Sequence, residues 1–238
     1  EEIYGDKLYS LPSGIASVTG LAVAFFVAFR MNTAYDRWWE ARKIMGELAA
    51  NSRKLASRAI LCFNKSNPEI SIKIIDMLKE YCINLKEHLF EPTPESKKST
   101  LSMLHNISLI IETKLNNNTL EKFDLLQIVN NLHDIQGKAE RTKFTPFLNV
   151  YKVFTKMMVY SYVLILPFLI GDIDIGGEDS FLEFLAILLI MMISHTFLLL
   201  NKLANLYGEP FDASEVSLPI DDIVLSLNKD LETIKELQ

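Results

Sequence analysis

The chain has 238 residues, of which 49% are hydrophobic and 23% are charged, with a mean hydropathy of +0.17 and a net charge of −6. A soluble domain of this size seldom has a mean hydropathy above zero, and a bundle that lies wholly in lipid seldom carries so much charge. The acidic balance also argues against a nucleic-acid-binding protein, whose contact surface is basic. The composition therefore indicates one part in a membrane and another part in water.

The first predicted element, within residues 1–59, is one long helix that begins near Gly14 and ends at about Ala59. The sixteen residues from Gly14 to Phe29 carry no charge, slightly fewer than the about 20 apolar residues that cross a bilayer. Charged residues follow at once, and neither Gly nor Pro separates the apolar part from the charged part. At 1.5 Å per residue such a helix is about 68 Å long, so we expect it to continue from the membrane into the cytoplasm.

Two rows of residues run along the apolar part of this helix. Small residues recur at every fourth position, which lets neighbouring backbones approach closely; they are Ala16, Gly20, Ala24 and Ala28. Large apolar residues form a second row about 100° further round the helix, namely Leu21, Phe25 and Phe29. Several such helices could ring a narrow axial hole, or the large side chains could face lipid or a partner helix. The spacing alone leaves both interpretations open.

Residues 60–146 form a predicted cytoplasmic helical region. Apolar residues recur there at helical spacing, and residues 90–100 and 116–119 are predicted loops because they are rich in Pro, Ser, Thr and Asn. Patterns typical of β-strands are almost absent from the chain. The predicted fold class is therefore all-α, an integral membrane helical protein with long helices that extend into a cytoplasmic helical domain.

Residues 147–207 are predicted to form two further membrane helices, joined by the acidic turn GDIDIGGEDS. Basic residues gather after Phe29 and at Lys152 and Lys156, so the positive-inside bias places these ends in the cytoplasm and the acidic turn outside. Residues 208–238 are then a cytoplasmic C-terminal segment. The alternative is that the apolar stretches are core helices of a soluble bundle, but Leu185–Leu200 is apolar all round rather than on one face.

Residues that could support catalysis or bind a metal form no recognisable motif. A P-loop, a nucleophile elbow, a zincin motif and a dinucleotide fingerprint are all missing from the sequence, so an enzyme is not predicted. Histidines 88, 105 and 133 are scattered, and we expect them to be exposed or capping. His195 lies in an apolar helix, where it either bonds a neighbour or ligates a metal. Cys62 and Cys82 are expected to be free thiols in a reducing compartment.

The acidic turn matches a calcium loop only in part. Asp172, Asp174, Gly177 and Glu183 occupy positions 1, 3, 6 and 12 of such a loop. Position 5 is Gly176, which offers no side-chain ligand. We interpret this segment as an acidic turn outside the membrane, and we predict no metal site and no cofactor.

The segment FRMNTAYDRWWEARKIMGELAANSRKLA (Phe29–Ala56) closely resembles the signature of the bestrophin family, particularly its bacterial members. Two later segments are similar to the family in order and spacing. They are Gly137–Asp172, with a glycine–x–x–Glu–Arg motif and a Pro-containing membrane helix, and Leu203–Ile234, with a Glu–Pro–Phe turn and a leucine–proline step. Together the three segments cover most of the chain from Gly14 onward.

The resemblance implies an ion channel in the bacterial inner membrane, a multi-pass protein in which five identical subunits surround one axial pore. Its partners would be other copies of itself, the lipid bilayer and small inorganic ions. Each subunit of the family has four membrane helices, and the first is missing here, as expected if the chain EEIYGDKLYS… begins inside a longer protein. The family's pore neck maps onto Leu21, Phe25 and Phe29, and its cytoplasmic constriction maps onto Leu120.

The neck residues also bear on the predicted ion selectivity. Two phenylalanines in the neck resemble the anion-conducting members, so chloride is favoured; the alternatives are a sodium channel of the same fold and a non-conducting membrane-anchored helical scaffold. Arg30, directly after the neck, either attracts anions or pairs with Asp36 or Glu40, which is the commoner fate of such a residue. Animal members bind calcium in an acidic run that reads Asp212, Ala213, Ser214, Glu215 here, so calcium activation is doubtful. Trp38 and Trp39 are either interfacial anchors or, as we prefer, packing residues of the cytoplasmic bundle.

Overall fold

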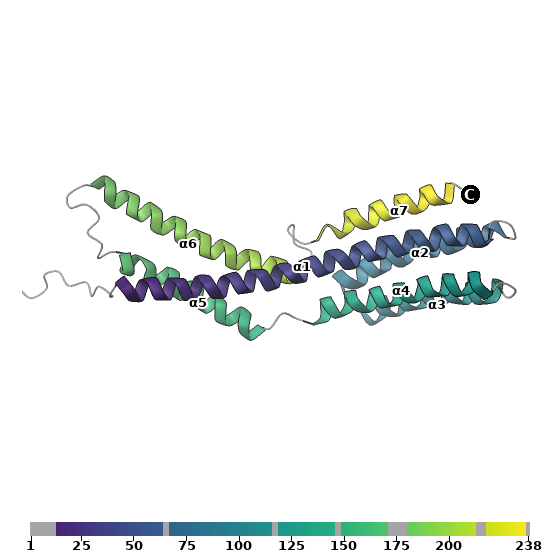
Figure 1. The fold of residues 1–238 in the computed structure, drawn as a ribbon, viewed down its shortest axis with the longest axis horizontal. Helices are drawn as coiled ribbons and strands as arrows, with labels where there is room; N and C mark the ends of the chain where they lie inside the picture. The colour runs from purple at the N-terminus through teal and green to yellow at the C-terminus, as the bar shows by residue number, and fades with distance from the viewer. Residues whose placement is uncertain are drawn as a thin grey trace, which may run out of the picture. The chain divides into compact units, whose positions relative to one another are not determined.

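The computed structural model describes residues 13–63, 67–115, 119–145, 149–170, 180–212 and 218–236. Every regular element in these residues is an α-helix (Figure 1), which confirms the predicted all-α class. The helices are α1 (Ser13–Phe63), α2 (Pro68–Phe90), α3 (Pro94–Lys114), α4 (Thr119–Phe144), α5 (Asn149–Ile170), α6 (Ser180–Gly208) and α7 (Ile220–Glu236). The long first helix is confirmed as one uninterrupted element of 51 residues.

The chain divides into two compact units, and α1 contributes to both. The first unit comprises residues 1–37 and 147–209, and the second comprises residues 38–146 and 210–238. The first unit therefore contains the start of α1 together with α5 and α6. The second contains the rest of α1 with α2, α3, α4 and α7.

The first unit has a small core and a large apolar surface. Its buried apolar cluster consists of Val23, Val27 and Val159, where α1 packs against α5. Most of α6 is exposed although it is apolar, with examples at Phe184, Ile187 and Met192. Core helices of a soluble bundle would bury such side chains. Within the described residues, α1 and α6 are both long and apolar enough to cross a membrane, so this unit has the surface expected of a protein in lipid.

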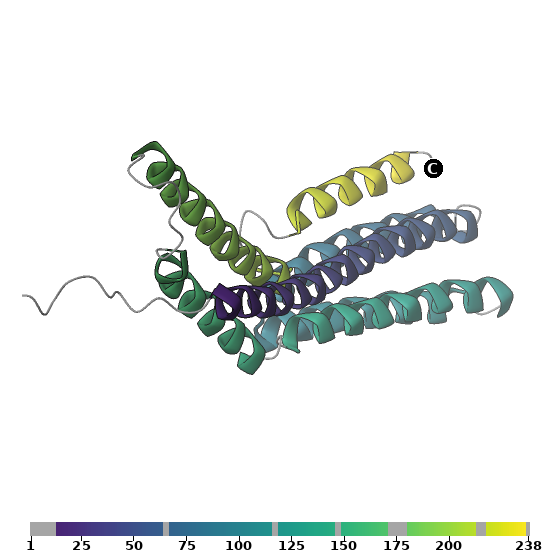
Figure 2. The same ribbon diagram turned by 60° about the vertical axis from the view of Figure 1, so that its left-hand side comes forward.

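The second unit is a helical bundle with a continuous apolar core. In both views α2, α3 and α4 run alongside the C-terminal part of α1, and α7 lies along α2 (Figures 1 and 2). Fully buried residues come from all five helices, for example Leu55, Leu78, Leu104, Leu132 and Leu231. Their helical spacing explains why each helix turns one face inward.

Several expectations can be compared with this bundle. The predicted loop at residues 90–100 is wrong in its second half, because α3 already begins at Pro94. Thr93 caps that helix: its Oγ1 accepts a hydrogen bond from the Ser96 backbone N–H, while Ser96 Oγ accepts one from the Thr93 N–H. This capping box and a proline at N1 start a helix rather than prolong a loop. The free thiols are confirmed at Cys62 and Cys82, and burial raises the pKa of the Cys82 thiol to about 12.

Trp38 and Trp39 differ in their burial and contacts. Trp38 packs against the core of the second unit, which confirms the packing interpretation for that residue. Trp39 is exposed, and its ring stacks on Trp38 with centroids 6.2 Å apart. The packing interpretation therefore holds for Trp38, whereas Trp39 only covers the Trp38 ring from outside.

A buried polar network joins α2, α3 and α4 in the same unit. The expectation that His88 is exposed or capping is wrong, because the residue is only 2% exposed. His88 Nδ1 lies 2.8 Å from Ser96 Oγ, and its Nε2 lies 3.7 Å from Glu140 Oε1. Glu140 also accepts from Gln136 Nε2 at 2.8 Å and pairs with Lys97 Nζ at 3.3 Å. The glutamate of the glycine–x–x–Glu–Arg motif therefore organises a polar cluster inside the bundle.

This network predicts a loss of stability in mild acid. Burial lowers the pKa of His88, an effect that Glu140 opposes and Lys97 reinforces. As the pH falls below about 6.5 the unfolded chain binds a proton at His88 before the folded protein does, so the free energy of unfolding decreases down to the folded-state pKa. Thermal unfolding between pH 8 and about pH 5 should show a falling midpoint, and His88→Gln should flatten the curve.

His133 contributes in the same direction, since burial lowers its pKa as well. His88→Gln should therefore remove part of the pH dependence rather than all of it. His105→Gln is the matched control, because His105 is an exposed histidine of the same unit. A pH profile that is identical in the wild type and His88→Gln would contradict the prediction.

Candidate ion-conducting site

The predicted neck residues share an exposed face of α1 in the first unit. Leu21, Phe25 and Phe29 are 74%, 58% and 51% exposed in the single chain. The opposite face carries Val23 and Val27, which are buried against α5 and α6. Because residues four apart stack along one side of a helix, the whole row lies on a face that the described residues of its own chain leave uncovered. The row is thus available to line a passage, to meet another copy or to meet lipid.

The two phenylalanines of the row contact each other. Their ring centroids are 4.4 Å apart and the ring planes cross at 72°. This is the edge-to-face arrangement that aromatic pairs favour, because the positive edge of one ring meets the negative face of the other. Phe26, one position on, turns towards α5 and makes a similar contact with Phe154.

The row of small residues faces the protein's own helices. A Cβ atom added at Gly20 would lie 2.6 Å from Tyr162 Oη, so the Tyr162 side chain of α5 lies directly against this glycine. Ala24 and Ala28 line a groove of about 340 Å³ against Thr196, Phe197 and Leu200 of α6. The side chain of Ala16 lies outside the described residues. Gly20 of the small-residue row therefore leaves room for a side chain of α5 within the same subunit.

Arg30, the residue after Phe29, is buried in a polar cluster formed by three helices. It is only 2% exposed. Its Nη1 donates to Thr155 Oγ1 of α5 at 3.0 Å and to Asn201 Oδ1 of α6, and its Nη2 donates to Asn205 Oδ1 of α6. Nearby, the Tyr151 hydroxyl donates to the Phe26 backbone oxygen at 3.2 Å. The guanidinium group thus joins α1, α5 and α6.

The partners of Arg30 are all neutral. The expected pairing with Asp36 or Glu40 is not found: Glu40 pairs with Lys43 instead, and Arg30 forms no ion pair with any carboxylate in the described part of the chain. The physical reason is helix geometry, because Arg30 faces α5 and α6, whereas Asp36 and Glu40 lie on other faces of α1. Buried charges are usually paired with an opposite charge. Here hydrogen bonds hold the guanidinium in place, and no described carboxylate compensates its positive charge.

The other predicted residues are dispersed. Leu120 lies in the first turn of α4 and is 83% exposed. His195 is exposed on α6. The partial calcium loop (residues 172, 174 and 177 with the side chain of Glu183) and residues 213–215 lie outside the described residues.

Sequence reasoning missed the polar partners of Arg30. Thr155, Asn201 and Asn205 received no role, although two asparagines four apart at the end of an apolar helix are a recognisable signal. Polar residues at such places tend to bond to a neighbouring helix or a charge. The signal identifies a polar cluster but does not identify Arg30 as its centre.

The chain matches the family model described as "Bacterial/Fungal Bestrophin protein" over residues 1–233. It is 24% identical to a Synechocystis protein named as a voltage-dependent anion channel-forming protein, with 96% of this chain and 80% of that one covered. It is 26% identical to the Escherichia coli protein YneE, which has the same descriptive name, over 90% of this chain and 74% of that one.

Among solved structures, the fold is similar to that of a bacterial bestrophin homologue from Klebsiella pneumoniae. The TM-score is 0.83 at 21% sequence identity, covering 95% of this chain and 88% of that one. A family model that matches nearly the whole chain and a fold shared with a bestrophin homologue lead to one conclusion. The protein belongs to the bestrophin family, in its bacterial and fungal group.

Proposed function

We propose that this chain is one subunit of a membrane anion channel, in which five copies surround an axial passage. Leu21, Phe25 and Phe29 form its apolar neck, and Leu120 forms a second constriction on the cytoplasmic side. The family assignment, the channel-forming names of the relatives and the exposed neck row support this proposal. The passage runs through a multi-pass protein of the bacterial inner membrane, with α1, α5 and α6 as its spans.

The observation that carries anion selectivity is the uncompensated charge of Arg30. At an effective dielectric constant of about 20, a unit charge about 10 Å away stabilises an anion by roughly 1.7 kcal/mol. Since 1.4 kcal/mol is about a tenfold preference, a few such charges after the neck are enough to exclude cations. An apolar neck contributes a barrier through dewetting, which does not depend on the sign of the ion. In this proposal Arg30 selects anions over cations, and the neck controls whether ions pass at all.

The experiment uses the purified protein reconstituted into planar bilayers under a sodium chloride gradient. An anion channel gives a reversal potential close to the chloride equilibrium potential. A reversal potential close to the sodium equilibrium potential would replace this proposal with the cation channel of the same fold. A protein that is folded and inserted yet passes no current would be a membrane-anchored scaffold.

A further inference from the structure

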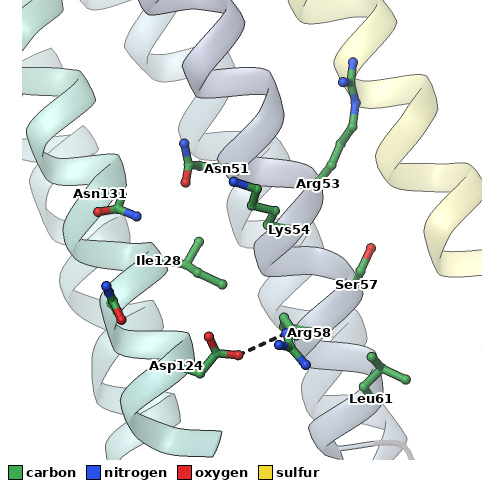
Figure 3. Close-up of a pocket in the computed structure, with 10 residues that line it drawn as sticks. Asn51, Arg53, Lys54, Ser57, Arg58, Leu61, Asp124, Ile128 and Asn131 are labelled. Atoms are coloured by element: carbon green, nitrogen blue, oxygen red, sulfur yellow. Dashed lines mark ion pairs between the residues drawn. The ribbon is translucent and has the colours of Figure 1, made fainter.

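A polar groove opens between α1 and α4 in the second unit, away from the neck residues (Figure 3). Its volume is about 650 Å³. Its lining is mostly polar and basic, with residues Asn51, Arg53, Lys54, Ser57, Arg58 and Leu61 from α1 and residues Asp124, Gln127, Ile128 and Asn131 from α4. Such a lining is suited to binding a charged or polar ligand.

The groove carries one positive charge that no described residue neutralises. Arg53 pairs with Asp230 of α7, with Nη2 2.8 Å from Oδ2. Arg58 pairs with Asp124 across the groove, with Nε 3.0 Å from Oδ2. Lys54 forms no ion pair with any residue that the structure describes. Because the two arginines are each matched by an aspartate, Lys54 leaves the groove with a net charge of about +1.

The amide groups around Lys54 offer both donors and an acceptor. Asn51 Nδ2 donates to the Glu47 backbone oxygen at 2.9 Å, which fixes the orientation of the amide. Asn51 Oδ1 accepts no hydrogen bond from the described residues, so it can accept one from a ligand. Within the described residues, the amides of Gln127 and Asn131 make no hydrogen bond to protein, so their N–H groups are free donors. Figure 3 shows the side chains of Asn51 and Lys54 on one side of the gap and that of Asn131 reaching towards them from the other.

We infer that this groove binds inorganic phosphate in its hydrogen phosphate form. Lys54 and the amide N–H groups of Asn131 and Gln127 suit the anionic oxygens, and a charged donor makes the strongest of these bonds. The P–OH group donates to Asn51 Oδ1. Sulfate and methyl phosphate dianion have no proton to donate at neutral pH, so the groove favours hydrogen phosphate over both. The Asp124 carboxylate is held by Arg58 and does not compete for Lys54.

The position of the groove relates it to conduction. Asp124, Gln127 and Asn131 follow Leu120 at i+4, i+7 and i+11, one stripe of α4. If the proposed function is correct, bound phosphate lies on the wall of the passage beyond the Leu120 constriction. Only this placement depends on the proposed function. Phosphate binding itself requires no pore.

The test is calorimetric titration of the full chain in detergent with sodium phosphate, sodium sulfate and methyl phosphate at neutral pH. Ionic strength is held constant with sodium chloride, so that screening does not differ between arms. The wild type should bind phosphate at millimolar concentrations and bind the other two anions several times more weakly. Lys54→Met should weaken phosphate binding about tenfold, the effect of losing one charge-assisted hydrogen bond.

Two further variants make the result specific. Lys98→Met is the matched control, because Lys98 is also an exposed helical lysine without an ion pair in the described residues, and its variant should bind phosphate as the wild type does. Asn51→Leu should remove the preference for phosphate over sulfate while keeping weak binding of both. Equal binding by wild type and Lys54→Met, or no binding at all, overturns the inference. These outcomes leave the conduction experiment unaffected, since that experiment measures current rather than binding.

Discussion

Replacing Phe25 and Phe29 together by alanine is expected to raise the single-channel conductance severalfold. Both side chains are exposed in the subunit, so their removal creates no cavity in the core of the subunit. Smaller side chains widen the proposed neck and reduce the free energy needed to keep it hydrated, because apolar constrictions gate by dewetting. The measurement is single-channel recording in planar bilayers, with the reversal potential recorded in the same membranes.

Val27→Ala is the control for this change. Val27 lies on the same helix between the two phenylalanines but is buried against α5 and α6. Its truncation should lower the thermal midpoint, by the equivalent of about 1 kcal/mol, and should leave the open-channel conductance unchanged. If the double alanine variant folds and assembles but conducts as the wild type does, these phenylalanines do not form the neck.

Substitutions at Arg30 should separate its charge from its hydrogen bonds. Arg30→Gln removes the charge and leaves Asn201, Asn205 and Thr155 with unsatisfied polar atoms in a buried site. We expect this variant to lose about 2 kcal/mol of stability and most of its preference for chloride. Arg30→Lys keeps the charge but lacks the fork that reaches three partners at once. It should lose stability and retain selectivity.

Two measurements together decide this prediction. Thermal unfolding in detergent reports the hydrogen bonds, and the reversal potential in a sodium chloride gradient reports the charge. Thr155→Val is the matched variant, because it removes one hydrogen-bond partner of Arg30 and no charge; it should destabilise mildly and conduct chloride selectively. Chloride selectivity that survives in Arg30→Gln would show that Arg30 does not select the ion.

The sequence predicted the fold well where the signal is local and periodic. The uninterrupted α1 follows from the absence of helix breakers between Leu21 and Met45, and the alternation of exposed Phe25 and buried Val27 follows from helical spacing. The start of α3 was missed because Pro and Thr were interpreted as loop residues, whereas Thr93 caps a helix and Pro94 opens it.

Contacts between distant segments could not be predicted in the same way. The partners of Arg30 lie more than 120 residues away, with Thr155 separated by 125 positions and Asn201 by 171. The burial of His88 depends on how α3 and α4 pack on α2, which no local pattern encodes. The charged residues near Arg30 in the sequence favoured Asp36 or Glu40 as its ion-pair partner. The helix face on which Arg30 lies instead directs its side chain towards α5 and α6.

The crossed rings of Phe25 and Phe29 limit what the aromatic pair can contribute to sorting ions by charge. With their planes at 72°, a direction that meets the π-cloud of one ring meets the C–H rim of the other. An ion moving past both would meet attraction at one level and repulsion at the next, whichever its sign. In the proposed neck, the quadrupoles of successive rings would thus largely cancel, and the proposal assigns the discrimination between ions to a full charge elsewhere on the helix.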